Sequence, residues 1–309
     1  MKNTFKFSAR ATAAAAVLAL GSSAFAVTFD ANLELDNTYR NGSAVGTLDQ
    51  GLSQGGRVEM NASGKAGTNL FVAGRASFLA KKDGTVGTDD MWIQFGSATS
   101  ALKLGRFEAA DLFPLVGDTL INNAGTVYGT NTLRGRKDGD QFHAAATTSL
   151  GNGLSLELGV VETKDAAKGI RPVVSYAAGA FSLSAALESG KYVSGNDVSG
   201  AGATVSYDLG TAKLTGSVAK GKSDAATRNA QSAFALTVAA GGLSVGVISA
   251  TNEATVGEEK VATVYASYSM PLFDIKGASV TPAISSSTAK TGAVETSENS
   301  LRVRLNYAF

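Results

Sequence analysis

The last nine residues, 301–309, alternate between apolar side chains at odd positions and mostly polar side chains at even positions. Their sequence, LRVRLNYAF, places aliphatic or aromatic residues at every odd position, while Arg302, Arg304 and Asn306 occupy even positions. A period of two is typical of a β-strand, because successive side chains of a strand point to opposite faces. This segment therefore predicts a strand with one apolar face, one charged face and an aromatic end, which suits a wall between lipid and water.

The first 26 residues have the three parts of an export signal. Lys2, Lys6 and Arg10 form a basic region, and residues 11–20 form an apolar region. Ala24-Phe25-Ala26 supplies a small-x-small cleavage site. We expect cleavage after residue 26 and a mature domain of residues 27–309; the alternative is a short amphipathic helix retained in the fold. No later window reaches the roughly 18 apolar residues that a membrane helix needs. If the chain lies in a membrane, it must cross as a barrel.

The composition narrows the class of protein further. The leader carries three of the 27 basic residues and no acidic residue, which leaves 24 basic against 26 acidic, a mature balance of −2. This balance argues against nucleic acid as a partner, since nucleic acid selects a clustered basic surface. The absence of cysteine excludes a disulfide framework. The 36 glycines and four prolines fit many short strands.

Segments of period two recur along the chain and predict sixteen antiparallel strands in one domain. An even number is what single-chain bacterial barrels require. The strands are expected at residues 27–39, 55–66, 69–81, 88–98, 101–107, 140–150, 153–163, 169–178, 180–190, 198–209, 211–221, 229–240, 242–252, 259–270, 276–288 and 299–309.

The expected connections alternate between tight turns and longer polar loops. The turns lie at residues 66–69, 97–100, 151–153, 178–179, 209–211 and 241–242, and the loops at 40–54, 82–88, 164–168, 191–198, 222–228, 253–258 and 289–298. We expect the turns and both termini on the periplasmic side. A soluble β-sandwich is the alternative, because its strands also alternate. A sandwich gives no reason for this order of connections or for the terminal Phe309.

Charged side chains within the expected strands share one parity. Arg57 and Glu59 alternate with Val58 and Met60, for example. A charge facing lipid at the bilayer midplane costs about 2–4 kcal/mol, so these charged positions are expected to line water. Most aromatic residues fall near strand ends, where interfacial girdles belong. The pattern therefore favours a transmembrane barrel with a polar lumen.

One connection is much longer than the others: residues 108–139 carry no sustained alternation, and a loop of that length is usually functional. At this point the chain resembles the general porin family of Gram-negative bacteria. The resemblance rests on the leader, the strand spacing, Leu104-Gly105-Arg106 at the end of the fifth strand, this third loop and the terminal Phe309. Tyr307 and Phe309 also resemble the signal that the barrel-assembly machinery reads.

The resemblance implies that the third loop folds into the barrel and narrows the lumen, with acidic loop residues facing a basic wall. The acidic candidates on the loop are Glu108, Asp111 and Asp118. The basic candidates on the wall are Arg57, Arg75, Lys103, Arg106, Arg302 and Arg304. A field across such a constriction orients dipolar solutes and selects ions by charge and size. The alternative for each residue is a solvated charge of the lumen or rim.

Two features of this region leave alternatives open. Arg106 shares parity with Leu102 and Leu104, so it faces lipid unless Gly105 forms a bulge or the strand ends there. The loop is also rich in apolar residues, including Phe107 and Phe113. Aromatic rings beside carboxylates suit a carbohydrate path, whereas the preferred interpretation is that these residues anchor the loop against the wall.

The sequence offers few residues that could support enzymatic chemistry. His143 is the single histidine, and no Gly-x-Ser-x-Gly motif accompanies it, so a serine hydrolase is disfavoured. Without cysteine, and with one histidine and no calcium-loop spacing, no metal site or cofactor is expected.

The sequence thus predicts an outer-membrane porin that passes small hydrophilic solutes and ions by diffusion. A carbohydrate-selective porin is the second hypothesis, and a barrel adhesin or surface antigen is the third. The partners that the resemblance implies are outer-membrane lipid and lipopolysaccharide, the barrel-assembly machinery and two further copies of the chain in a homotrimer.

Overall fold

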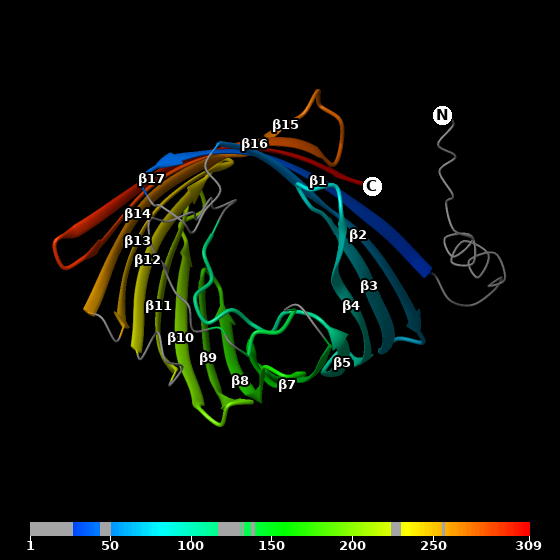
Figure 1. The fold of residues 1–309 in the computed structure, drawn as a ribbon. Helices are drawn as coiled ribbons and strands as arrows, with labels where there is room; N and C mark the ends of the chain where they lie inside the picture. Colours follow the sequence, from blue (N-terminus) through cyan, green and yellow to red (C-terminus); the bar gives the residue numbers. More distant parts are fainter. Residues whose placement is uncertain are drawn as a thin grey trace, which may run out of the picture.

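Backbone pairing in the computed structural model runs from each strand to the next and around a closed ring (Figure 1). The structure describes residues 27–43, 51–116, 131, 133–136, 140–223, 230–254 and 257–309; the expected leader and Asp118 lie outside these residues. The strands are β1 (Val27–Gly42), β2 (Gly51–Ala66), β3 (Leu70–Ala80), β4 (Val86–Ser97), β5 (Ser100–Arg106), β6 (Gln141–Gly151), β7 (Leu154–Thr163), β8 (Ala167–Ala178), β9 (Phe181–Tyr192), β10 (Asp197–Asp208), β11 (Lys213–Ser223), β12 (Ala230–Ala240), β13 (Leu243–Ala254), β14 (Gly257–Tyr268), β15 (Met270–Pro271), β16 (Ala278–Thr291) and β17 (Val294–Ala308).

The ring closes between the first and last strands. β1 pairs with β17 from Asn32, opposite Ala308, to Gly42, opposite Glu298, and it pairs with β2 on its other side. All described pairings are antiparallel, and the ring leaves no open sheet edge among the described strands. A closed sheet satisfies the backbone hydrogen bonds that lipid cannot satisfy. The predicted all-β barrel is confirmed, and the sandwich is excluded.

The described residues form sixteen barrel strands, because β14 and β15 are two parts of one strand. Both parts pair with β16 in a single register, in which Ser267 lies opposite Ala283 and Met270 lies opposite Val280. That register places Pro282 opposite the gap. Proline has no amide hydrogen to donate, so the ladder is interrupted at this point.

All sixteen predicted strands are present, and the largest differences lie at their ends. β2 begins at Gly51 rather than at residue 55, and β17 begins at Val294 rather than at residue 299. Pairing between β16 and β17 continues through polar residues as far as Thr291 and Val294. The loop expected at residues 289–298 is therefore mostly strand, and the expected alternation of short and long connections is weaker than predicted.

Side-chain exposure follows the predicted alternation. In β7, Leu156, Leu158 and Val160 are exposed on the outer face, whereas Val161 and Thr163 are buried on the inner face. Exposed leucine, valine and isoleucine recur on the outer face of the other strands. Such an apolar band is what a lipid-facing wall requires. Within the part of the chain that the structure describes, no helix is long and apolar enough to cross a bilayer.

The described residues of the connection between β5 and β6 lie inside the ring, as expected for the third loop (Figure 1). These residues are 107–116, 131, 133–136 and 140. Phe113 packs against inner-wall residues of the β11–β16 region, including Ala235 and Ile248. Leu112 and Leu133 are almost fully buried. The apolar residues of the loop thus anchor it to the barrel wall.

Candidate pore constriction

Ser77 of β3 lies opposite two residues of β4, Asp89 and Asp90, because the β3–β4 register shifts by one residue. A bulge of this kind disrupts the alternation of side chains, and both carboxylates point into the barrel. The Ser77 hydroxyl donates to Asp89 Oδ2 at 3.0 Å and accepts the Asp90 amide at 2.8 Å. The bulge therefore gives the wall two adjacent, buried acidic groups.

Two arginines of the wall neutralise these acidic groups. Arg57 Nε lies 2.9 Å from Asp89 Oδ2, and Arg57 Nη1 lies 3.7 Å from Glu59 Oε1. Arg75 Nη1 lies 3.2 Å from Glu59 Oε1 and 3.6 Å from Asp90 Oδ2. β2, β3 and β4 thus contribute alternating positive and negative groups to one strip of the inner wall.

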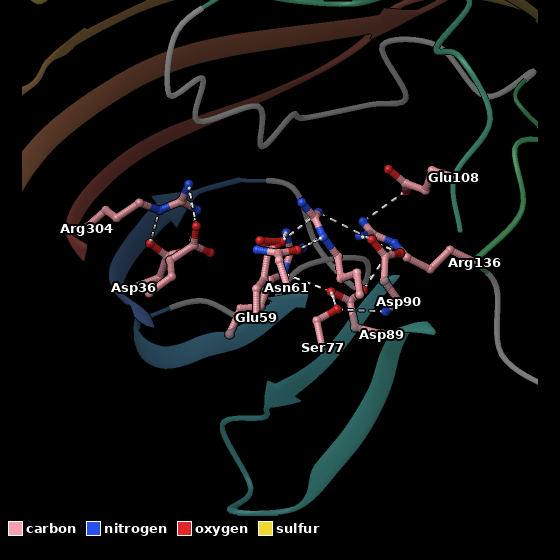
Figure 2. Close-up of polar contacts among 12 residues, drawn as sticks. Asp36, Glu59, Asn61, Ser77, Asp89, Asp90, Glu108, Arg136 and Arg304 are labelled. Carbon is pink, nitrogen blue, oxygen red and sulfur yellow. Dashed lines mark hydrogen bonds and ion pairs between the residues drawn. The ribbon is translucent and has the colours of Figure 1, made fainter. Parts of the chain in front are cut away.

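The inserted loop joins this strip through Arg136 (Figure 2). Arg136 Nε lies 3.1 Å from Asp89 Oδ1, Nη1 lies 3.6 Å from Asp90 Oδ1, and Nη2 lies 3.0 Å from Glu108 Oε1. Gly135 and Arg136 both have positive φ angles, of 90° and 53°. This tight turn brings the Arg136 guanidinium between the wall and the first half of the loop.

The two halves of the loop pair with each other. Arg134 contacts Glu108 at 2.9 Å and Asp111 at 3.0 Å. Asp111 Oδ1 also accepts hydrogen bonds from the Phe113 amide at 2.9 Å and from Asn131 Nδ2 at 2.8 Å. We refer to the nine charged residues of the strip and the loop as the wall–loop network: Arg57, Glu59, Arg75, Asp89, Asp90, Glu108, Asp111, Arg134 and Arg136.

This network corrects the expected contrast between an acidic loop and a basic wall. Glu108 and Asp111 are neutralised by arginines of the loop itself. The described ion pairs between loop and wall have the opposite polarity, since Arg136 of the loop meets Asp89 and Asp90 of the wall. The bulge is the reason, because it places two acidic groups where alternation allows one.

A second group of charges lies where the barrel closes, and we call it the closure cluster. Arg304 of β17 donates to both carboxylate oxygens of Asp36, each at 2.7 Å, and its Nη1 lies 3.0 Å from Glu34. Arg302 lies 3.8 Å from Asp36. Figure 2 shows the Arg304–Asp36 pair to one side of the wall–loop network. Among the described residues, the sequence candidates Arg302 and Arg304 pair with acidic groups of β1.

Lys103 and Arg106, the two candidates on β5, have different surroundings. Lys103 Nζ lies 4.1 Å from the centre of the Trp92 ring and 4.3 Å from that of Phe107, in cation–π geometry. Arg106 lies opposite Met91 in a continuous register, and its Nε donates to the Asp89 carbonyl oxygen at 2.9 Å. The bulge proposed at Gly105 is absent from β5; instead, β5 ends at Arg106, and the bulge lies in β4.

The two aromatic rings proposed for sugar contact are buried. Phe107 is 3% exposed and stacks on His143, with ring centres 3.7 Å apart. Phe113 is 5% exposed and packs in the wall cluster described above. Neither ring has a free face for a passing sugar, which corrects that assignment. His143 is fully buried, and its Nδ1 lies 2.9 Å from the Phe107 carbonyl oxygen.

The C-terminal residues complete the β1–β17 seam. Phe309 and Ala31 exchange both backbone hydrogen bonds, at 2.8 and 3.0 Å. The rings of Tyr307 and Phe309 lie 5.2 Å apart, and both are exposed at the outer face. This placement fits aromatic residues at a lipid interface, and their role as an assembly signal stays a prediction.

The sequence candidates for the constriction omit five acidic residues of the two charge groups: Glu34, Asp36, Glu59, Asp89 and Asp90. Glu34 and Asp36 share the parity of the inner face in β1, which the sequence displays. The signal for the bulge is the pair Asp89-Asp90 itself, since alternation turns one of two successive carboxylates toward lipid. A bulge is the local change that gives both a polar environment.

No protein-family model matches the sequence, and the search of curated proteins found no match. Solved structures do match along nearly the whole chain. The outer-membrane protein OmpT of Vibrio cholerae superposes with a TM-score of 0.69 at 14% identity, over 94% of this chain and 99% of that one. The anion-selective porin of Comamonas acidovorans gives 0.67 at 18% identity, over 93% and 100%. A variant of the Rh. blastica porin gives 0.61 at 15%, over 92% and 100%.

These similarities, together with the closed ring and its apolar outer band, define the class of protein. The chain is an antiparallel, multi-pass β-barrel of the outer-membrane type, with the fold of sixteen-stranded porins.

Proposed function

We propose that this chain is a porin of a Gram-negative outer membrane, through which small hydrophilic solutes and ions diffuse passively. The observation that carries the proposal is the inserted loop, whose Arg136 meets Asp89 and Asp90 of the wall inside a closed barrel. A wet constriction lined with charge selects by size, charge and dipole without a chemical step. His143, the single histidine, is fully buried beneath Phe107 and is thereby withheld from solutes.

The near-balance of charge among the described residues of the proposed constriction predicts weak ion selectivity. The wall–loop network has five carboxylates and four arginines, and the closure cluster has two of each. Opposite charges within 4 Å cancel much of each other's field at a distance. We therefore expect solute size to dominate passage, with local fields orienting dipolar solutes. Burial of Phe107 and Phe113 removes the main support for a carbohydrate path.

Assembly follows from the same proposal. The outer apolar band contacts lipid, with lipopolysaccharide in the outer leaflet, and the Tyr307–Phe309 end is read by the barrel-assembly machinery during insertion. We propose a homotrimer, in keeping with the trimer form named for one OmpT structure.

Single-channel recording tests the proposal. Refolded protein in a planar bilayer should produce stable conductance steps, grouped in threes, that malto-oligosaccharides do not block. Block by sugar would instead support the carbohydrate-selective hypothesis. Absence of channels from barrels whose folding has been verified would overturn both channel hypotheses and favour an adhesive barrel.

A further inference from the structure

A buried ion pair on the wall contacts the inserted loop at β8 and β9, whereas the wall residues of the wall–loop network lie on β2, β3 and β4. Arg171 of β8 and Glu188 of β9 occupy facing positions on the inner surface, and their side chains form a close ion pair. The two side chains are 1% and 0% exposed. Buried charges of this kind are costly unless they are paired and further hydrogen-bonded.

Three further hydrogen bonds between described residues join this pair to the loop. Arg171 Nη2 donates to the Ala110 carbonyl oxygen at 2.6 Å and to Asn131 Oδ1 at 3.1 Å. The Leu133 amide donates to Glu188 Oε2 at 3.2 Å. Ala110 belongs to the first half of the loop, whereas Asn131 and Leu133 belong to the returning half. One ion pair of the wall therefore holds both halves at once.

Glycines of β8, β9 and β10 shape the wall around this pair. A Cβ atom at Gly190 would lie 2.8 Å from Leu133 Cδ1, and one at Gly200 would lie 2.8 Å from Leu112 Cδ1. A Cβ at Gly202 would overlap the Leu112 carbonyl. Because glycine has no side chain, these positions let the loop lie directly against the strands, within reach of Arg171.

We propose that Arg171 and Glu188 form a latch that fixes the inserted loop. The latch thereby positions the constriction, although neither residue lines it. The wall–loop network holds the loop near β4, and the latch holds it at β8 and β9. Together with the packing of Phe113 against the β11–β16 region, these attachments position the described part of the loop inside the barrel. The effect on conductance rests on the proposed function, whereas the effect on loop position does not.

Thiol labelling tests the latch independently of conductance, because the chain has no cysteine. Ala109→Cys introduces a reporter at a loop position that is 6% exposed. Arg171→Lys keeps a charge opposite Glu188, but one ammonium lacks the fork that reaches Glu188, Ala110 and Asn131 together. We expect a water-soluble maleimide to label the reporter slowly in the parent barrel and several-fold faster after Arg171→Lys or Glu188→Gln.

Glu157→Gln is the matched control, since Glu157 of β7 accepts a hydrogen bond from Thr147 of the wall at 3.2 Å. Its labelling rate should equal that of the parent. The double variant Arg171→Leu/Glu188→Leu removes the buried charges together and keeps the test valid if a single variant fails to fold. Unchanged labelling in Arg171→Lys and in the double variant would overturn the latch. Faster labelling with unchanged conductance would support the latch and refute the constriction.

Discussion

Arg136 on the inserted loop and Asp89 in the bulge of β4 join the loop to the barrel wall, with 3.1 Å between Nε and Oδ1. The contact exists because the bulge directs Asp89 inward and because the turn at Gly135 directs Arg136 toward it. Neutralising the acidic side of this contact and neutralising its arginine should therefore shift ion selectivity in opposite directions.

Neutralising the bulge should favour anions. Asp89→Asn/Asp90→Asn leaves Arg57, Arg75 and Arg136 with two fewer counter-charges. We expect the reversal potential in a salt gradient to shift toward the value for anions. Asp197→Asn, in an exposed pair with Lys191 near a strand end, should not shift it. Equal potentials in the bulge variant and the parent would remove both residues from the constriction.

Neutralising the loop arginine should have the reverse effect. Arg136→Gln leaves Asp89, Asp90 and Glu108 short of one positive partner, so the constriction gains net negative charge. We expect a shift toward cation selectivity, measured in the same salt gradient and weakened at high ionic strength, where charges are screened. A shift toward anions would contradict the arrangement described for this loop.

Ser77 should be important for the stability of the bulge. Ser77→Ala removes the hydroxyl that bonds Asp89 and the Asp90 amide, and it leaves buried groups without that partner. Such a loss costs about 1–3 kcal/mol. Urea unfolding in lipid vesicles should therefore give a lower free energy of unfolding. Ser175→Ala removes one hydroxyl contact, to Ser184 at 3.3 Å, and should cost less. Equal losses in the two variants would count against a structural role for the bulge contacts.

The barrel was predictable from the sequence because alternation and connection spacing are local properties. Each strand from β1 to β17 carries its own inward and outward parity, so sixteen strands follow without knowledge of their partners. The inserted loop was also predictable in outline, from its length and its lack of alternation. The ends of the strands were less predictable. Backbone pairing between β16 and β17, for example, continues into polar residues that show no alternation of apolar and polar side chains.

The charge arrangement was not predictable, because it depends on which residues face each other across strands. Alternation places Asp89 outside the barrel, and only its register against Ser77 brings it inside. Arg171 and Glu188 likewise look like ordinary wall charges in the sequence. Their role follows from the cross-strand pairing of β8 with β9 and from loop atoms distant along the chain.

The glycine at position 202 gives a last prediction, which concerns the packing of the loop against β10. A Cβ at Gly202 overlaps the Leu112 carbonyl, so Gly202→Ala must push the loop away from β10 and toward the middle of the lumen. We expect a smaller single-channel conductance, together with about 1–3 kcal/mol of destabilisation from overpacking. Gly216→Ala is the matched control, because its Cβ meets no atom closer than the Ala235 carbonyl oxygen at 4.0 Å. Parent-like conductance in Gly202→Ala would mean that the loop does not bound the narrowest part of the pore.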